Sequence, residues 1–180
     1  MGFSGEETVL GLGHDLVSIA EFAERLAMPG TRMSRLFSVR EQRQSQERAR
    51  VKGDDVESHL AVRWAGKEAV LKAWSEALRD EPAPYGLDDF PWGGIEILDD
   101  RRGRPGVHLG QEVQDRLDES LPDPSDSRQS RLGWSGVNGD DSVGAFEANP
   151  RGAASLVWRI ALSHDGGIAS AVVLLCCRWS

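Results

Sequence analysis

The sequence has little that would cross-link it or hold it in a membrane. It has two cysteines among its 180 residues, the neighbours Cys176 and Cys177. Adjacent residues of a strand point to opposite faces, so we expect reduced structural cysteines rather than a disulfide. No segment reaches the roughly 20 apolar residues of a membrane helix. The first residues lack the basic and apolar segments of a signal peptide. These absences predict a cytoplasmic protein with no membrane partner.

Motifs of several common enzyme classes are also missing or incomplete. The segment Gly11–Asp15 has two glycines of a dinucleotide-binding fingerprint, but Leu16 stands where the third is required. The histidines show no metal-ligand spacing. Ser163–Asp165 contains the residue types of a hydrolase triad, but a triad is defined by geometry and consecutive side chains rarely converge. A triad hydrolase is therefore not favoured.

The charge is unevenly distributed along the chain. The net charge is −8, yet residues 25–52 contain eight basic and two acidic residues, a local charge of +6. Such a segment can attract an acidic partner, although a solvated helix and loop face is the plainer alternative. Nucleic acid is disfavoured as a partner because the rest of the chain is acidic and aromatic residues do not alternate with the basic ones.

Hydrophobic periodicity predicts an α+β fold with an antiparallel sheet. The expected strands are 8–14, 94–98, 105–109, 154–163 and 168–177, and the expected helices are 16–28, 39–50, 54–79 and 110–121. Residues 122–153 are rich in Ser, Asp, Gly, Asn and Pro and have no steady period. We interpret them as a mobile insertion within a single domain, 1–180.

The most informative residue is Glu68, a carboxylate within an apolar helical stripe. The stripe consists of Leu60, Trp64, Leu71, Trp74 and Leu78, which recur at steps of three and four. A buried carboxylate is costly unless something positive meets it. We therefore expect Glu68 to meet a metal ion, a basic side chain or a ligand. The alternative is a weak surface pair with Lys72.

Basic residues surround Glu68 at helical spacing. Arg63, Lys67 and Lys72 lie within about one turn of it. One acid among three bases suits a magnesium–phosphate site, because Mg²⁺ prefers carboxylate and phosphate oxygens and the cations hold the remaining phosphate charge. Gly66 costs this helix roughly 1 kcal/mol relative to alanine, which indicates that another group approaches the backbone there.

A second acid, Asp15, follows a glycine-rich strand. Strand alternation puts Gly11, Gly13 and Asp15 on one face and Leu10 on the other. The two glycines leave space for a carboxylate at the strand end to meet another backbone or a bound ion. The alternative is an ordinary turn in which Asp15 caps the following helix.

Together, Gly11–Val17, Leu60–Ala73 and Leu162–Gly166 resemble holo-acyl-carrier-protein synthase, the short type of 4′-phosphopantetheinyl transferase. Leu36–Glu41 and Gly103–Pro105 add smaller similarities, and actinobacterial members are the most similar. The resemblance implies the phosphopantetheinyl transferase fold, a small antiparallel sheet packed with a long central helix and shorter helices.

The same resemblance implies a reaction. Phosphopantetheine would pass from coenzyme A to a serine of an acyl carrier protein, with release of adenosine 3′,5′-bisphosphate. Asp15 and Glu68 would be the Mg²⁺ ligands, and Lys67 would contact a phosphate or the leaving group. Arg63 and Lys72 would hold other phosphates of the nucleotide.

The resemblance also implies where coenzyme A and the carrier protein bind. The nucleotide pocket would be lined by Gly103, Arg104, Pro105, Ser163 and His164. The acidic carrier protein, or a carrier domain of a fatty acid synthase, would dock on Arg25, Arg32 and Arg35. Family members usually form trimers with each active site shared between neighbouring subunits. Two other functions stay open, a non-catalytic module that binds coenzyme A or a carrier protein, and a nucleotide hydrolase using the same metal site.

Overall fold

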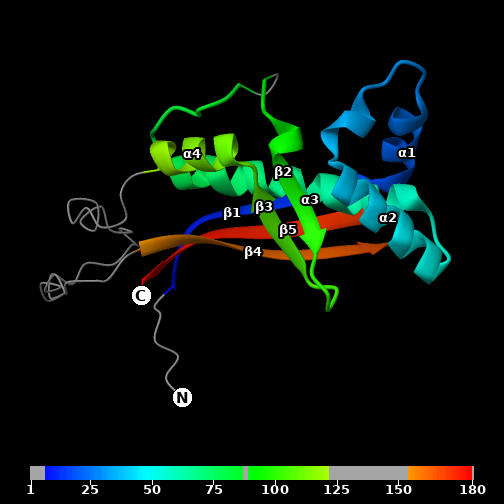
Figure 1. Cartoon of the computed structure of the whole chain (residues 1–180). Coiled ribbons are helices and arrows are strands. Elements are labelled where there is room, and N and C mark those ends of the chain that lie inside the picture. The colour runs from blue at the N-terminus through cyan, green and yellow to red at the C-terminus, as the bar shows by residue number, and fades with distance from the viewer. Residues whose placement is uncertain (1–6, 87–88, 122–153, 180) are drawn as a thin grey trace, which may run out of the picture.

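The computed structural model describes residues 7–86, 89–121 and 154–179 (Figure 1). The helices are α1 (Ile19–Ala27), α2 (Val39–Lys52), α3 (Val56–Leu78) and α4 (Gln111–Ser120), with 3-10 helices η1 (Met33–Leu36) and η2 (Trp92–Gly94). The strands are β1 (Glu7–Ser18), β2 (Ile95–Asp99), β3 (Pro105–Leu109), β4 (Ala154–Asp165) and β5 (Ile168–Trp179). The predicted α+β class is confirmed, and the insertion predicted at 122–153 lies outside the described residues.

The strands form two antiparallel sheets. The larger has the order β1-β5-β4, and the smaller is the β2–β3 hairpin, which crosses in front of it (Figure 1). Gly166 and Gly167 join β4 to β5 with positive φ angles of 55° and 81°, which glycine adopts without steric cost. The long helix α3 lies along one face of the larger sheet and contacts both β1 and β5.

β1 is longer than the sequence predicts. Its pairing with β5 continues to Ser18 opposite Ile168, so Asp15 lies inside the strand and not at its end. The side chain that caps α1 is therefore Ser18, which accepts from the Glu21 N–H, and not Asp15. The predicted alternation also breaks at Leu10, where a register shift turns this side chain into the core.

The main core lies between α3, the larger sheet and the hairpin. Its largest fully buried apolar side chains are Trp74, Ile95, Ile97, Leu117 and Leu175. The approach predicted at Gly66 is confirmed, since a Cβ there would lie 3.1 Å from Cγ1 of Ile97 on β2. A smaller cluster around Phe22 and Phe37 joins α1 and η1 to the first turns of α3.

The face of the larger sheet opposite α3 leaves several apolar side chains exposed. Leu12 and Leu16 of β1 are 51% and 61% exposed, and Val172 of β5 is 39% exposed. In the β1–β5 register Val172 is opposite His14, which lies midway between Leu12 and Leu16 on β1, so the three side chains share one face. In the part of the chain that the structure describes, no helix has the length and hydropathy needed to cross a bilayer.

Candidate active site

Asp15, Glu68 and Lys72 come together where β1 lies on α3. The two backbones almost touch, because a Cβ on Gly11 would stand 2.1 Å from the carbonyl oxygen of Ala73. The ammonium of Lys72 lies 2.7 Å from Oδ1 of Asp15 and donates to the carbonyl oxygen of His14 at 3.1 Å. A strand residue and two residues of one helix face therefore form a compact polar cluster.

The two carboxylates of this cluster are incompletely compensated. Burial and then the negative charge of Asp15 raise the pKa of Glu68 to about 7, against the opposing charges of Lys72 and Arg25. Oδ2 of Asp15 is buried and has no hydrogen-bond partner among the described residues. An additional cation would stabilise both features, because buried negative charge is costly without a positive partner.

The carboxylate oxygens of this cluster suit a cation that also binds the phosphates of a substrate. Within residues 7–86, 89–121 and 154–179, no group of three Asp, Glu, His or Cys side chains is arranged to hold a metal. Mg²⁺ does not need such a group, since it is usually bound through one or two carboxylates together with water and substrate phosphates. Asp15 and Glu68 are therefore the residues that could hold it.

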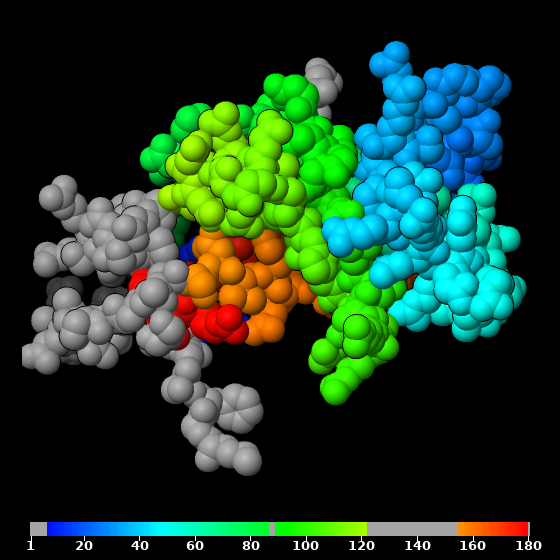
Figure 2. All heavy atoms as spheres, in the orientation of Figure 1, coloured from blue at the N-terminus to red at the C-terminus, as the bar shows by residue number. Residues whose placement is uncertain are grey.

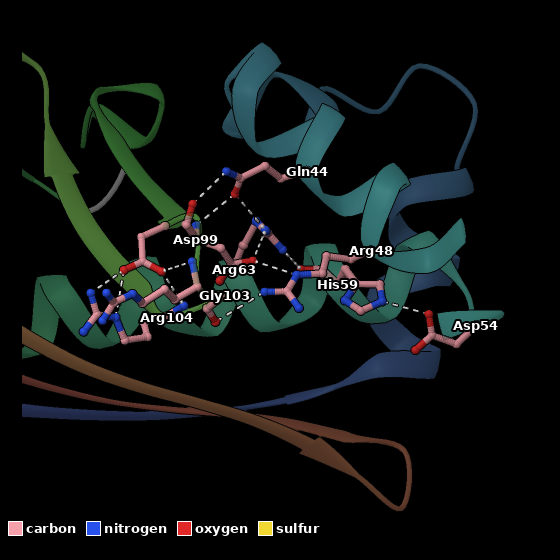
Figure 3. A network of polar contacts seen from close by, with 10 residues as sticks. Gln44, Arg48, Asp54, His59, Arg63, Asp99, Gly103 and Arg104 are labelled. Carbon is pink, nitrogen blue, oxygen red and sulfur yellow. Dashed lines mark hydrogen bonds and ion pairs between the residues drawn. The ribbon is translucent and has the colours of Figure 1, made fainter. Parts of the chain in front are cut away.

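A second polar group lies between α2, α3 and the β2–β3 hairpin (Figure 3). The guanidinium of Arg63 lies 3.2 Å from Oδ2 of Asp99 and 3.3 Å from Oε1 of Gln44. Arg48 donates to the same Asp99 oxygen at 3.2 Å and to the carbonyl oxygen of Gly103 at 3.3 Å. These contacts hold the turn end of the hairpin against both helices.

His164, at the end of β4, is linked to the start of α3. Its ring lies 5.6 Å from that of His59, and Nε2 of His59 is 2.8 Å from Oδ1 of Asp54 (Figure 3). Burial, followed by the positive charges of Lys52 and His59, lowers the pKa of His164. The neutral imidazole is thus favoured, and it can act as a hydrogen-bond donor and acceptor.

Two hollows flank the hairpin, which stands in front of β4 in the space-filling view (Figure 2). One, of 680 Å³, includes Arg104, Pro105, His108 and Arg159 in its lining. The other, of 410 Å³, includes Gly103 and Arg48. Three of the five residues predicted for the nucleotide pocket, Gly103–Pro105, therefore line open hollows in which arginines stand beside the carboxylates of Asp99 and Asp100.

Sequence comparison identifies the family of proteins that shares these features. Residues 11–129 match the sequence model of the 4′-phosphopantetheinyl transferase superfamily. The chain is 45% identical over 170 residues to a holo-[acyl-carrier-protein] synthase from Bifidobacterium animalis subsp. lactis, covering 93% of this chain and 97% of that protein. The chain belongs to the holo-acyl-carrier-protein synthase family of phosphopantetheinyl transferases.

Solved structures of the family share this fold. The apo-ACPS structure from Chronobacterium ammoniagenes has a TM-score of 0.67 at 32% identity, covering 96% of this chain and 97% of that one. The ACPS–CoA complex from the same organism has a TM-score of 0.64 at 34% identity, covering 94% and 97%. The predicted fold, and its similarity to actinobacterial synthases, are confirmed.

In this member of the synthase family, the residues predicted to bind phosphate lie at two separate positions. Lys72 lies beside Asp15, next to Glu68, as expected for one cluster. Arg63 precedes Glu68 by five residues, which places it about 140° away around the helix, toward the hairpin. His164, near the end of β4, lies beside His59 at the start of α3, whereas its strand neighbour Ser163 points to the opposite face of the sheet. One chain therefore does not bring all the predicted residues to one point.

Lys67 is not where the sequence places it. Its side chain is fully buried, its ammonium donates to three backbone carbonyls, and it pairs with Glu41 at 3.0 Å. Burial lowers the pKa of Lys67, and Glu41 opposes that shift. The predicted contact of Lys67 with a phosphate or leaving group is wrong, because all its donors are used inside the core.

The predicted carrier-docking residues are available at the surface. Arg25 on α1, Arg32 before η1 and Arg35 within it are all exposed. Arg25 also acts on Glu68, since its positive charge opposes the rise of that carboxyl's pKa. The basic segment thus begins close to the acidic cluster.

Sequence reasoning missed Glu41, Gln44 and Asp99. Glu41 could have been found, because Ser38 and Glu41 have the spacing of a capping box and both of its hydrogen bonds are present at the start of α2. Gln44 and Asp99 gave no such signal, because their contacts depend on how the hairpin meets α2.

Proposed function

We propose that this chain transfers the 4′-phosphopantetheine group of coenzyme A to a serine of an apo acyl carrier protein. The serine oxygen attacks the β-phosphorus of coenzyme A, and its proton passes to the surrounding water. The bond from that phosphorus to the bridging oxygen breaks, and adenosine 3′,5′-bisphosphate leaves with the electron pair. The products are the holo carrier protein and the nucleotide.

The observation that carries this proposal is the pairing of Asp15 with Glu68 in a chain of this family. Their carboxylates, one with a buried oxygen that has no hydrogen-bond partner in the described part of the chain, would hold Mg²⁺. Bound there, the ion would neutralise charge on the pyrophosphate of coenzyme A.

Lys72 and Arg25 would both act beside the acidic pair, since the charge of each acts on Glu68. The ammonium of Lys72 is half exposed and uses only part of its donor capacity on Asp15 and His14, so it can also donate to a phosphate oxygen. The exposed guanidinium of Arg25, with Arg32 and Arg35, would attract an acidic carrier protein and bring its serine toward Glu68.

The completed site would be shared between copies of the chain in a homotrimer. The acidic cluster would come from one copy, and the nucleotide-binding residues Gly103–Pro105 and His164 from a neighbour. Two observations support this arrangement. Arg63 and Glu68 face different sides of α3, and Leu12 and Leu16 present apolar surface with no cover among the described residues. A cytoplasmic location belongs to the same proposal, since the buried thiols Cys176 and Cys177 suit a reducing compartment.

Intact-mass spectrometry of apo carrier proteins, incubated with coenzyme A and Mg²⁺, tests the activity. We expect the carrier mass to rise by one phosphopantetheine, and the rise to disappear with EDTA, with Asp15→Asn and with Glu68→Gln. Carrier binding without a mass change would identify a non-catalytic module. Turnover of coenzyme A in the absence of carrier would identify a hydrolase. Normal labelling by either variant would reject the metal assignment.

A further inference from the structure

The buried ion pair of Lys67 and Glu41 connects five elements of the fold, α2, α3, η1, η2 and β2. The side chains are 0% exposed and their charged atoms are 3.0 Å apart. The Lys67 ammonium also donates to the carbonyl oxygens of Leu36, Trp92 and Ile95, at 2.6, 2.9 and 2.5 Å. Lys67 on α3 therefore fixes the end of η1, η2 and the start of β2.

Glu41 makes the matching contacts from α2. One carboxylate oxygen accepts from the N–H of Ser38 at 2.8 Å, and the other accepts from the N–H of Ile97 at 3.0 Å. Both charged groups are thus fully hydrogen-bonded, which a buried pair requires if it is not to destabilise the fold. A buried pair of this kind contributes little net stability relative to apolar packing, so its value lies in fixing one arrangement of the elements it joins.

One of the elements that Lys67 holds is η1. It carries Arg35 and follows Arg32, and a second side chain from α2 also holds it. Nε2 of Gln42 donates to the carbonyl oxygens of Ser34 and Phe37, both at 3.1 Å. Polar contacts to backbone carbonyls at its end thus position a short 3-10 helix that has no side-chain cap of its own.

Lys67 precedes Glu68 in the chain, and the two side chains leave α3 about 100° apart. One turn of helix therefore carries both a carboxylate of the acidic cluster and the ammonium that holds η1. We infer that Lys67 is a positioning residue, which, paired with Glu41, fixes the basic carrier-docking segment at η1 relative to Glu68. It does not contact the substrate, because each of its donors is used within the core.

This inference rests on the proposed function and predicts a specific kinetic effect. If η1 loses its fixed position, carrier docking should weaken while coenzyme A binding and the reacting groups stay in place. In the full chain, the double substitution Glu41→Met with Lys67→Met removes the link to Leu36 and leaves no unpaired buried charge. We expect the KM for the carrier to rise about tenfold, with KM for coenzyme A and kcat within about twofold of wild type.

Gln42→Ala provides an independent test that leaves the ion pair intact. It removes both hydrogen bonds to the segment 34–37 and should raise the carrier KM in the same direction by a smaller factor. Leu117→Ala is the matched control, because Leu117 is a fully buried residue on α4, away from η1. It should lower thermal stability without changing the carrier KM.

Three results would overturn the inference. They are an unchanged carrier KM in both Gln42→Ala and the double variant, a loss of kcat with both KM values unchanged, and a rise in the KM for coenzyme A alone. If instead wild-type protein labels no carrier at all, the proposed function fails, which is a separate outcome. If the double variant is insoluble, Gln42→Ala decides.

Discussion

Gly13 of β1 and Ala69 of α3 lie so close that a Cβ on Gly13 would stand 1.9 Å from the Ala69 carbonyl oxygen. Gly11 makes the equivalent contact with Ala73 one helical turn further on. Asp15 follows Gly13 by two residues on the same strand face, and Glu68 immediately precedes Ala69. The glycine–alanine contact therefore determines how closely the two carboxylates approach each other.

We predict that Gly13→Ala lowers both stability and activity. The obstructing atom belongs to a helix backbone and cannot rotate away, so β1 must move from α3. Overpacking of this kind costs about 1–3 kcal/mol, and we expect the upper end of that range here. Urea unfolding measures the cost, and carrier labelling of the folded fraction measures the displacement of Asp15.

Gly93→Ala is the control for this substitution. A Cβ at Gly93 would meet only the carbonyl oxygen of Arg35, at 3.8 Å, an ordinary contact. Its stability should stay within about 0.5 kcal/mol of wild type. Equal behaviour of the two variants would contradict the importance of the close approach.

Glu68 should make stability depend on pH when no divalent ion is present. Its folded-state pKa of about 7 lies above the ordinary value of 4.5. The protonated carboxyl is favoured in the fold, so its contribution is complete below about pH 4.5 and is lost as the pH rises through 7. Because the side chain is only half-buried, we reduce the full linkage energy to about 1–2 kcal/mol.

The measurement is urea unfolding in EDTA from pH 5 to pH 8, comparing wild type with Glu68→Gln. Relative to wild type, the variant should gain about 1–2 kcal/mol between those pH values. Glu112→Gln, exposed on α4, should show no such change. A constant difference between wild type and Glu68→Gln would mean that the fold does not raise the pKa of Glu68, through burial or through the Asp15 charge.

The sequence was sufficient to predict the elements of the fold and to single out the two acids for attention, because each depends on local patterns. Period, capping residues and glycine positions identified α2, α3 and both hairpins within a few residues. Glu68 stood out because a carboxylate is unusual in an apolar stripe. Asp15 stood out because only glycines permit so close a contact between a strand and a helix.

The environment of the basic residues could not be predicted in the same way. Lys67 precedes Glu68 by one residue and Lys72 follows it by four, and the sequence predicted a phosphate contact for both, yet Lys67 is fully buried and Lys72 is half exposed. The difference arises because α3 is covered almost all round, by the sheet on one side and by η1 and β2 on another. Helical periodicity gives the direction of a side chain but not the element that it meets.

Lys72→Met should reduce activity and leave the fold intact. The ammonium is half exposed, so its pair with Asp15 contributes at most about 1 kcal/mol to stability. Removing it takes a positive charge away from the site proposed for the pyrophosphate, and we expect kcat/KM for coenzyme A to fall at least about a hundredfold. Steady-state labelling at saturating carrier measures this effect.

Arg116→Met is the control for general loss of a surface cation. Arg116 is exposed on α4 and, like Lys72, pairs with an acid, here Glu119 at 3.3 Å. Its variant should retain wild-type activity and melting temperature. Similar losses in both variants would show that net charge, not the position of Lys72, is responsible.

The open face of the larger sheet provides the test of a shared active site. Leu16→Lys puts a charge on a side chain that is 61% exposed in one chain, so a monomer should tolerate it. If this face is covered by another copy, the charge becomes buried and assembly should fail. We expect sedimentation velocity to show a monomer, and labelling activity to fall at least about tenfold. A variant that remains a trimer, or a monomer with full activity, would contradict the shared site.

Mixing two inactive variants tests the same arrangement without disturbing assembly. Asp15→Asn removes one carboxylate of the acidic cluster, and His164→Ala removes a residue of the second polar group. Suppose that each site takes Asp15 from one copy and His164 from a neighbouring copy. Refolding the two variants together then creates some sites in which the His164→Ala chain supplies an intact Asp15 and the Asp15→Asn chain supplies an intact His164. Part of the activity should return at these sites. If each chain supplies both residues to its own site, no mixture can recover activity. Because neither substitution alters the sheet face, the oligomeric state should stay the same, and recovered labelling would report directly on which chains form the site.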